Sequence, residues 1–364
     1  MELSCIYCGG KKLTDEHYLP EGLGRFRGFE VLSGRVCKVC QGKCSQLEEQ
    51  FLRSSPEAFF RKLVARVGKK HHKKVEMFYR RHAGTSPIQI VGPYPGEKYP
   101  VLWEPNEGQR TIREMRQIIV ADDKGEYYPI PVSDTLRTAE DLKPILQMFE
   151  GKKVAVVAVF ADPPDFERMR ALVIAINPKG KVSWKERTDE SARVDVVGTA
   201  TLTDRYFRAI AKIGLHYFLK MSGRYTGHEE IFKPIKNFII DGGDWRPHVQ
   251  WHKGSLAANV DRQMRPNTYL HLLVAEKLYI AIRAKMQFFV GPDIQPFIYE
   301  VRLAANPERI IADEQWAHAY VYFDKKDPQG FDGVMEPMTT ISKALIPYRA
   351  GRQLARRQRI RTTP

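Results

Sequence analysis

Cysteine is missing from almost the whole chain. The 364-residue sequence has five cysteines, and none of them lies beyond residue 44. A secreted protein that depends on disulfides would have cysteines throughout its fold, so this clustering favours metal binding in a reducing compartment. Residues 1–4 also lack the basic and apolar pattern of a secretory signal. We therefore expect a cytoplasmic protein.

Long apolar segments and acidic residues are scarce as well. The longest apolar run extends only from residue 154 to residue 161, whereas a membrane-spanning helix needs about twenty residues. The 43 acidic residues are outnumbered by 58 Lys and Arg, which gives a net charge of +15. This excess favours a polyanionic partner, nucleic acid before an anionic membrane surface. The alternative is a basic protein whose charge serves only solubility.

The composition is otherwise that of a folded protein. Hydrophobic residues make up 43% of the chain and aromatic residues 11%, which is enough for a full core. We predict an α+β fold in which a small N-terminal zinc-bound ββα module precedes a larger mixed α+β body. The expected segments are the module over 1–55, a basic helical connector over 56–84, a substrate-selecting or regulatory body over 85–345, and a basic tail over 346–364.

Within the body, the spacing of apolar residues predicts individual elements. Thr203 and Asp204 begin a helix that continues to about Met221. Residues 118–121 and 127–130 form a hairpin. The remaining expected elements are a helix over 138–149, a buried strand over 153–160, and strands over 269–274, 279–284 and 296–303.

Four of the cysteines occur as two Cys-x-x-Cys pairs. A two-residue gap lets both sulfurs of a pair bind one ion, and structural zinc takes four such ligands in a closed tetrahedron. We predict a structural Zn²⁺ ion held by Cys5, Cys8, Cys37 and Cys40, with Cys44 as an unliganded thiol. The alternative is a set of reduced thiols that pack together in a core.

An acid and a histidine lie between the two cysteine pairs: Glu16 and His17, followed by Pro20. Neighbouring side chains in a strand point to opposite faces. A strand that ends before Pro20 would let the Glu16 carboxylate reach a metal ion while the His17 imidazole faces a water molecule.

The order Cys-x-x-Cys, Glu-His-x-x-Pro, Cys-x-x-Cys resembles the zinc-stapled members of the HNH endonuclease family, the ββα-metal nucleases. The resemblance covers about residues 3–55 and implies a metal-dependent endonuclease that hydrolyses phosphodiester bonds of DNA. By this resemblance His17 would be the general base, and Glu16 would bind a catalytic Mg²⁺ or Mn²⁺ ion. The matching residues are Cys5-Ile6-Tyr7-Cys8-Gly9, Glu16-His17-Tyr18-Leu19-Pro20 with Gly22-Leu23-Gly24, and Cys37-Lys38-Val39-Cys40-Gln41.

The sequence departs from the family pattern after the second cysteine pair. Gln41 and Ser45 stand where the family commonly has Asn, His or Lys. The amide oxygen of Gln41 can still orient or bind the catalytic ion. Glu48, two helical turns further on, is a substitute ligand on the same helix face. The alternative function is a catalytically weak or inactive zinc module that binds nucleic acid through basic segments.

One of these basic segments is the connector, and its candidate nucleic-acid-binding residues are Lys69, Lys70, Lys73 and Lys74. We expect them to contact the phosphate backbone of DNA, with RNA as an alternative partner. A solvated helix face is the competing interpretation. A third reading is an interaction protein whose α+β body binds another protein, and only the size of that body favours it.

Overall fold

The computed structural model divides the chain into two compact units. Unit 1 contains Met1–Arg61, Arg66–Lys74 and Leu202–Pro364, and unit 2 contains Lys62–Ala65 and Val75–Thr201. The structure describes residues 4–29, 31–53, 55–63, 89–106, 111–132, 153–176, 181–187, 197–199, 202–256, 269–278, 281–291, 297–305, 314–322, 329 and 331–337.

Unit 1 combines the N-terminal residues with the chain from Leu202 onward. Among the described residues, no helix is long and apolar enough to cross a membrane. The helices of unit 1 are α1 (Lys38–Arg53), α5 (Asp204–Ser222) and α6 (Lys233–Asp241). Helix α2 (Pro56–Leu63) lies at the boundary of this unit in the sequence. Its strands are β1 (Leu13–Glu16), β2 (Phe26–Arg27), β3 (Leu32–Cys37), β12 (Val249–His252), β13 (Leu270–Lys277), β14 (Ala281–Val290), β15 (Ile298–Ala305), β16 (Glu314–Tyr322) and β17 (Gly333–Pro337).

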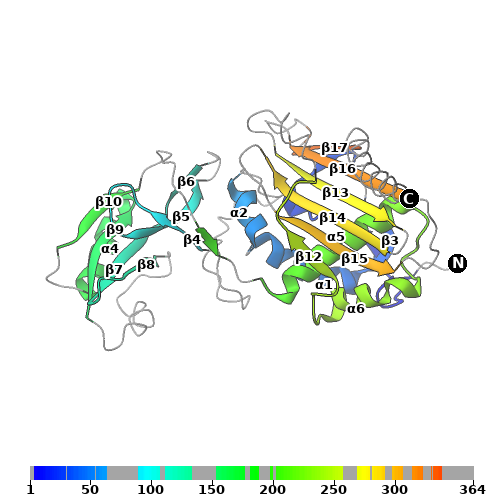
Figure 1. Ribbon diagram of the computed structural model, residues 1–364, viewed down its shortest axis with the longest axis horizontal. Helices are drawn as coiled ribbons and strands as arrows, with labels where there is room; N and C mark the ends of the chain where they lie inside the picture. Colours follow the sequence, from blue (N-terminus) through cyan, green and yellow to red (C-terminus); the bar gives the residue numbers. More distant parts are fainter. Residues whose placement is uncertain are drawn as a thin grey trace, which may run out of the picture. The chain divides into compact units, whose positions relative to one another are not determined.

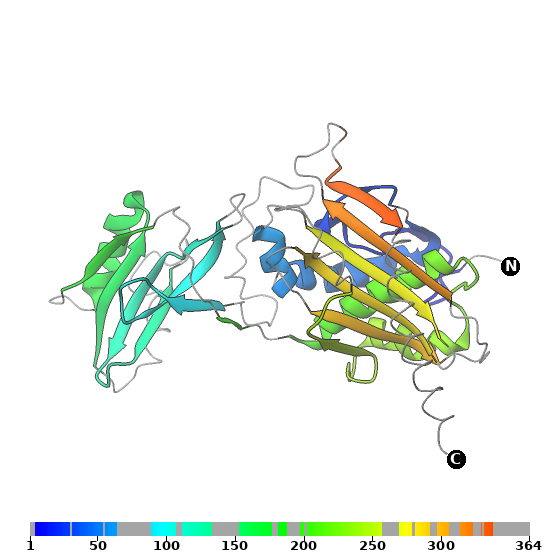
Figure 2. The same cartoon turned by 45° about the horizontal axis from the view of Figure 1, so that its top comes forward.

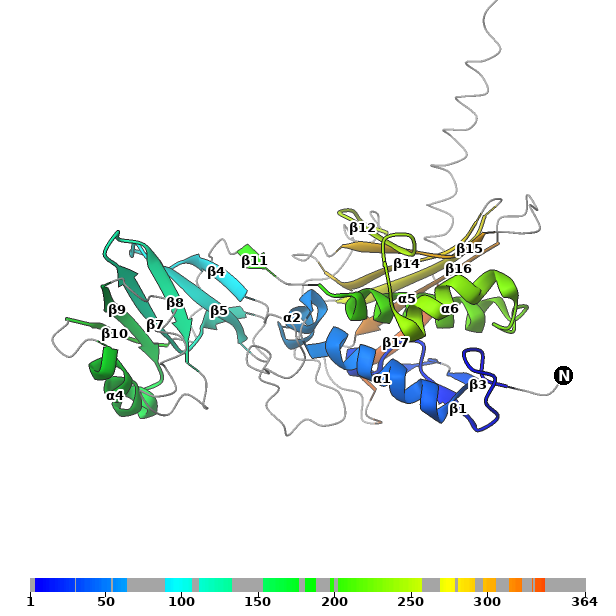
Figure 3. The same ribbon diagram turned by 90° about the horizontal axis from the view of Figure 1, so that it is seen from below.

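A seven-stranded sheet is the main layer of unit 1, with the strand order β12-β15-β14-β13-β16-β17-β2 (Figure 1). Its neighbouring strands are antiparallel except for β17 and β2, which pair in parallel. Helices α5 and α6 cover one face of this sheet, and α1 lies beyond them, so that the unit has three layers (Figure 3). Figure 2 shows the yellow and orange strands in front of the green helix α5.

Helix α5 lies at the centre of these layers. Apolar residues such as Ile213 and Phe218 are buried on several of its sides, which suits a helix between a sheet and a second helix. A Cβ atom added at Gly214 would lie 3.1 Å from the Ala284 side chain of β14, so glycine allows the helix to approach the sheet closely. Gly223 ends the helix with a φ of 60°, a conformation that glycine adopts without strain.

The N-terminal residues are part of the large sheet. Phe26 and Arg27 of β2 pair with Gly333 and Val334 of β17, which adds an edge strand to the sheet. The Phe26 ring is buried and packs edge-on against His271 of β13. The core of the sheet therefore extends into the segment between the two cysteine pairs.

Unit 2 consists of two four-stranded sheets, with the orders β10-β9-β7-β8 and β11-β4-β5-β6. Helix α4 packs on β9, and apolar side chains such as Val159 and Leu172 form the core between them. The elements of this unit are β4 (Gln89–Pro93), β5 (Pro100–Asn106), β6 (Thr111–Glu114), β7 (Gln117–Asp122), β8 (Tyr127–Pro131), β9 (Val154–Ala161), α4 (Phe166–Ile176), β10 (Ser183–Glu186) and β11 (Val197–Thr199).

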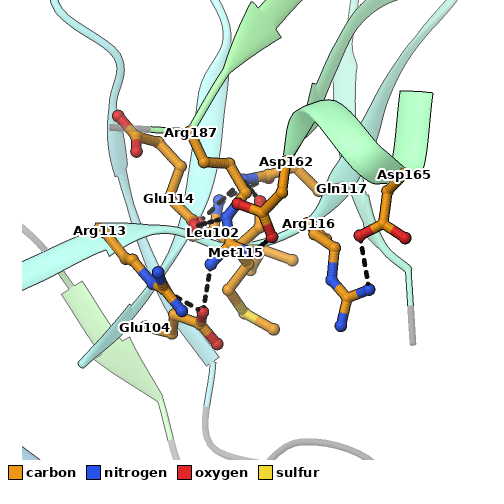
Figure 4. A network of polar contacts seen from close by, with 10 residues as sticks. All are labelled: Leu102, Glu104, Arg113, Glu114, Met115, Arg116, Gln117, Asp162, Asp165 and Arg187. Atoms are coloured by element: carbon orange, nitrogen blue, oxygen red, sulfur yellow. Dashed lines mark hydrogen bonds and ion pairs between the residues drawn. The ribbon is translucent and has the colours of Figure 1, made fainter. Parts of the chain in front are cut away.

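A buried arginine connects the strands of unit 2 (Figure 4). The Arg187 guanidinium forms ion pairs of 2.5 Å with Glu104 and 2.9 Å with Asp162. Its Nε atom donates a hydrogen bond to the main-chain oxygen of Glu114. A buried guanidinium is stable only with acceptors such as these. Since the acceptors come from β5, β6 and the residue after β9, the network connects these strands. We assign it a structural role.

The structure confirms several elements expected from the sequence. The mixed α+β class is correct, β7 and β8 form the expected hairpin, and β9, α5, β13, β14 and β15 lie close to their predicted positions. Strands β16 and β17 had no counterpart among the predicted elements. The N-terminal residues share a unit with the chain from Leu202 onward. The helix predicted over 138–149, the basic tail over 346–364, and Lys69, Lys70, Lys73 and Lys74 lie outside the described residues.

A buried histidine joins three parts of unit 1. The Nε2 atom of His271 lies 2.7 Å from the Tyr322 hydroxyl group and 3.3 Å from the main-chain oxygen of Leu23. Its Nδ1 atom accepts a hydrogen bond from the main-chain N–H of Phe289, whose φ is 54°. Burial lowers the pKa of His271 to about 3.

We expect this histidine to make unit 1 sensitive to acid. Its unfolded pKa is about 6.5, so its stabilising contribution is present above that pH and is lost as the pH falls toward 3. Replacing His271 by Gln should lower the free energy of unfolding at pH 7. Between about pH 6.5 and pH 4, the free energy of unfolding should also fall less steeply with pH in the variant than in wild type. The difference in slope should be up to about 1.4 kcal/mol per pH unit. Urea unfolding at several pH values measures both effects, and parallel profiles for the two proteins would contradict the prediction.

Candidate functional site

The four paired cysteines form one cluster. The sulfur atoms of Cys5, Cys8, Cys37 and Cys40 lie within 4.8 Å of one another. In a tetrahedral site with Zn–S distances of about 2.3 Å, sulfurs lie about 3.8 Å apart. The Cys8 and Cys37 sulfurs are 3.5 Å apart. This cluster can hold a structural zinc ion, and Cys44, which is buried in α1, is not part of it.

Local structure explains how the cysteines meet. The first pair lies in a turn that is closed by a 2.8 Å hydrogen bond from the Cys5 N–H to the Gly10 oxygen. In this turn Gly9 has a φ of 72°, which favours glycine. Strand β3 ends at Cys37 and α1 begins at the next residue, so Cys40 lies on the first helical turn. The main-chain N–H of Cys40 lowers the pKa of Cys37 to about 7, which favours the thiolate that binds zinc.

A buried cluster of ion pairs is the second chemical feature of this region. The Nζ atom of Lys212 lies 2.7 Å from the Glu16 carboxylate at the end of β1 and 2.5 Å from the Glu48 carboxylate on α1. It also donates a hydrogen bond to the main-chain oxygen of His17. The Lys212 side chain is completely buried. Three oxygen atoms from the N-terminal residues thus converge on one ammonium group from α5.

The charges in this cluster depend on one another. Burial disfavours the ammonium form of Lys212, but the carboxylates of Glu48 and Glu16 outweigh burial and raise the pKa of Lys212 above its usual value. Burial also raises the pKa of Glu48, although Lys212 opposes this shift. A hard divalent ion with a role in phosphate chemistry needs carboxylates that water and substrate can reach. Carboxylates in contact with a buried ammonium do not offer this access.

The other expected site residues have different surroundings. The His17 side chain is 37% exposed, and its Nε2 atom lies 3.7 Å from the Glu21 carboxylate. The His17 ring stacks on Phe29, with ring centroids 5.5 Å apart and an angle of 11° between the planes. The Gln41 amide group donates a hydrogen bond to the main-chain oxygen of Asp15. The structure therefore brings the carboxylates of Glu16 and Glu48 together at Lys212. The His17 side chain is partly exposed, and the Gln41 amide group bonds to the main chain.

Polar contacts between α5 and the N-terminal residues continue one helical turn after Lys212. His216 is completely buried, and its Nε2 atom lies 2.7 Å from the hydroxyl group of Tyr7. Burial lowers the pKa of His216 well below its usual value. Tyr7 lies between the cysteines of the first pair, so α5 contacts the cysteine cluster region as well as the acidic residues.

Sequence reasoning missed Lys212. A signal was present, because this lysine interrupts the apolar stretch Ala209–Leu215 within a helix that the sequence predicted. A buried lysine requires an acidic partner. The partner itself is not readable from the sequence, since Glu48 lies 164 residues away from Lys212.

A comparison with known protein families, with curated proteins and with solved structures finds no match for this chain. The chemistry of the site therefore rests on its own residues.

We expect one zinc ion per chain in the purified protein. Each cysteine pair supplies two ligands, so Cys8→Ser and Cys40→Ser should each lose the ion and lower the thermal midpoint. Cys44→Ser is the matched control and should retain the ion. Elemental analysis and thermal unfolding measure the two effects. A wild-type protein without zinc, with the same thermal midpoint before and after chelation, would show that the thiols only pack together.

We also expect the Lys212 ammonium to stabilise unit 1 strongly. Lys212→Met keeps most of the side-chain volume but leaves the buried carboxylates of Glu16 and Glu48 without a counter-ion. The free energy of unfolding should fall by about 3–5 kcal/mol, as measured by urea unfolding at pH 7. Adding Glu16→Gln and Glu48→Gln removes the uncompensated charges and should recover part of this loss. Equal losses in the single and triple variants would assign the effect to packing instead of charge.

Proposed function

We propose that the protein binds nucleic acid through a zinc-stapled ββα module of the HNH type that lacks an open site for the catalytic metal ion. The order of β1, β3 and α1 and the four clustered cysteines support such a module. The net charge of +15 supports a polyanionic partner, with DNA preferred and RNA as the alternative.

The exposed charges of the module support the same partner. Phosphate contacts from Lys and Arg supply most of the affinity in non-specific binding to nucleic acid. Within the described residues from 4 to 53, exposed cations outnumber exposed acids. The exposed Lys and Arg are Lys11, Lys12, Arg25, Arg27, Lys38 and Lys43, and the exposed acids are Asp15 and Glu49.

The contact of Lys212 with Glu16 and Glu48 is the observation that favours binding over cleavage. In the HNH reading, Glu16 holds a Mg²⁺ or Mn²⁺ ion that also contacts the scissile phosphate. In this chain an ammonium group already neutralises Glu16, and Glu16 is only 4% exposed. The ammonium itself is buried and does not face a substrate. The carboxylates therefore hold α5 in place and do not present a metal ion.

A metal-dependent endonuclease with His17 as the general base is the second candidate. The half-exposed imidazole favours it, because a general base must reach a water molecule. The nearby Glu21 carboxylate is placed to orient the ring. This candidate requires Glu16 to exchange Lys212 for a divalent ion.

Binding and cleavage assays on the same preparations distinguish the two candidates. A labelled DNA duplex should bind the full chain, with an affinity that decreases linearly on a double-logarithmic plot against salt concentration. In a plasmid nicking assay with Mg²⁺ or Mn²⁺, wild type, His17→Ala and Glu16→Gln should be equally inactive.

Metal-dependent nicking by wild type that disappears in His17→Ala would instead establish the endonuclease. Absence of DNA and RNA binding at low salt would refute the proposed function itself.

A further inference from the structure

Two exposed arginines of the module lie on either side of a buried aromatic residue. Arg27 belongs to strand β2, and Arg25 directly precedes this strand. Phe26, between them, is buried in the core, whereas both arginines are exposed. They lie at the edge of the seven-stranded sheet, where β2 is the last strand.

An aromatic ring holds both arginines. The Cζ atom of Arg25 lies 5.6 Å from the centroid of the Phe331 ring, and that of Arg27 lies 5.8 Å from it. Such cation–π contacts restrict long, flexible side chains before a ligand arrives, which reduces the entropy lost on binding. A guanidinium group carries a flat fork of N–H donors that matches the geometry of a phosphate group.

A stacked pair of rings lies close to the arginines in the chain. Gly28, with a φ of 82°, turns the chain after Arg27 and leads to Phe29. The Phe29 ring stacks on His17, and both residues are partly exposed. Cations beside a stacking platform are the combination that binds a nucleic acid strand, since phosphates pair with the cations and bases stack on rings.

We propose that Arg25 and Arg27 form a phosphate-binding surface through which the module holds nucleic acid, with the stacked Phe29 and His17 beside it. The inference rests on the proposed function and adds the surface that performs it. An acid of this region, Asp332, accepts a hydrogen bond of 2.9 Å from the main-chain N–H of Arg25. Asp332 is only 8% exposed, so its carboxylate contributes little to the open face of this surface.

The scarcity of exposed large apolar side chains in the described part of the module favours nucleic acid over a membrane. A membrane-binding surface needs exposed apolar groups beside its cations. Among the described residues of the module, the exposed large apolar side chain is Val39, which lies on α1 instead of β2. The arginine surface therefore offers charge and hydrogen-bond donors.

The test compares two double variants of the full chain in binding a labelled DNA duplex. Arg25→Ala/Arg27→Ala should reduce the affinity at least about tenfold at low salt. The slope of log K against log salt concentration should decrease in magnitude by about 1.8, because two phosphate contacts are lost. The matched control, Lys12→Ala/Lys43→Ala, removes the same charge from the same module and should change both quantities clearly less.

A second double variant, Arg25→Gln/Arg27→Gln, keeps the aliphatic part of both side chains next to Phe331. It should show the same loss of DNA affinity, and it replaces the alanine variant if that protein is unstable. Wild-type affinity in the arginine variants would overturn the inference while leaving the proposed function intact. Equal losses in the arginine and lysine variants would also overturn it, since affinity would then follow net charge alone. If the arginine variants lost binding only to phosphatidylserine vesicles, the surface would belong to a membrane. A wild-type protein that binds no nucleic acid would refute the proposed function as well.

Discussion

The ion pairs of Lys212 with Glu16 and Glu48 hold unit 1 together. The three residues come from α5, from the end of β1 and from α1, and α5 packs in turn on the large sheet. A buried ammonium without its carboxylates, or the carboxylates without the ammonium, would be strongly unfavourable. The cysteine-rich segment and helix α5 therefore depend on each other for a neutral interior, and they belong to the same compact unit.

This dependence explains why a cluster of four cysteines does not have to stabilise the N-terminal segment alone. Segments of this size usually need a metal ion because their apolar core is too small. Here Phe26 packs into the core of the sheet, and Tyr7 contacts the buried His216 of α5. A zinc ion held by the four cysteines would fix the local geometry of the two pairs, while the sheet and α5 supply most of the burial.

The predictable parts of this structure are those that local patterns determine. Ligand spacing brought Cys5, Cys8, Cys37 and Cys40 together correctly, and apolar periodicity located α5 and the strands β13 to β15. The sequence also suggested that Glu16 and Glu48 would share one cation. It did not show that the cation is Lys212. The contact of Lys212 with the two carboxylates depends on how α5 packs against the N-terminal residues, and no local sequence pattern indicates this packing. The pairing of β2 with β17 is hidden for the same reason, since these strands lie far apart in the chain.

Two acids close to a histidine are compatible with two different chemistries, and the group between the acids decides which applies. A divalent ion in that position makes the acids part of a reaction, whereas an ammonium makes them part of the core. Lys212 fills the position in this chain. Buried charge fixes the N-terminal residues against α5, whereas the exposed charge on β2 lies at the edge of the large sheet. The same segment thus combines a four-cysteine cluster that can hold zinc with a pair of acids whose shared cation belongs to the protein itself.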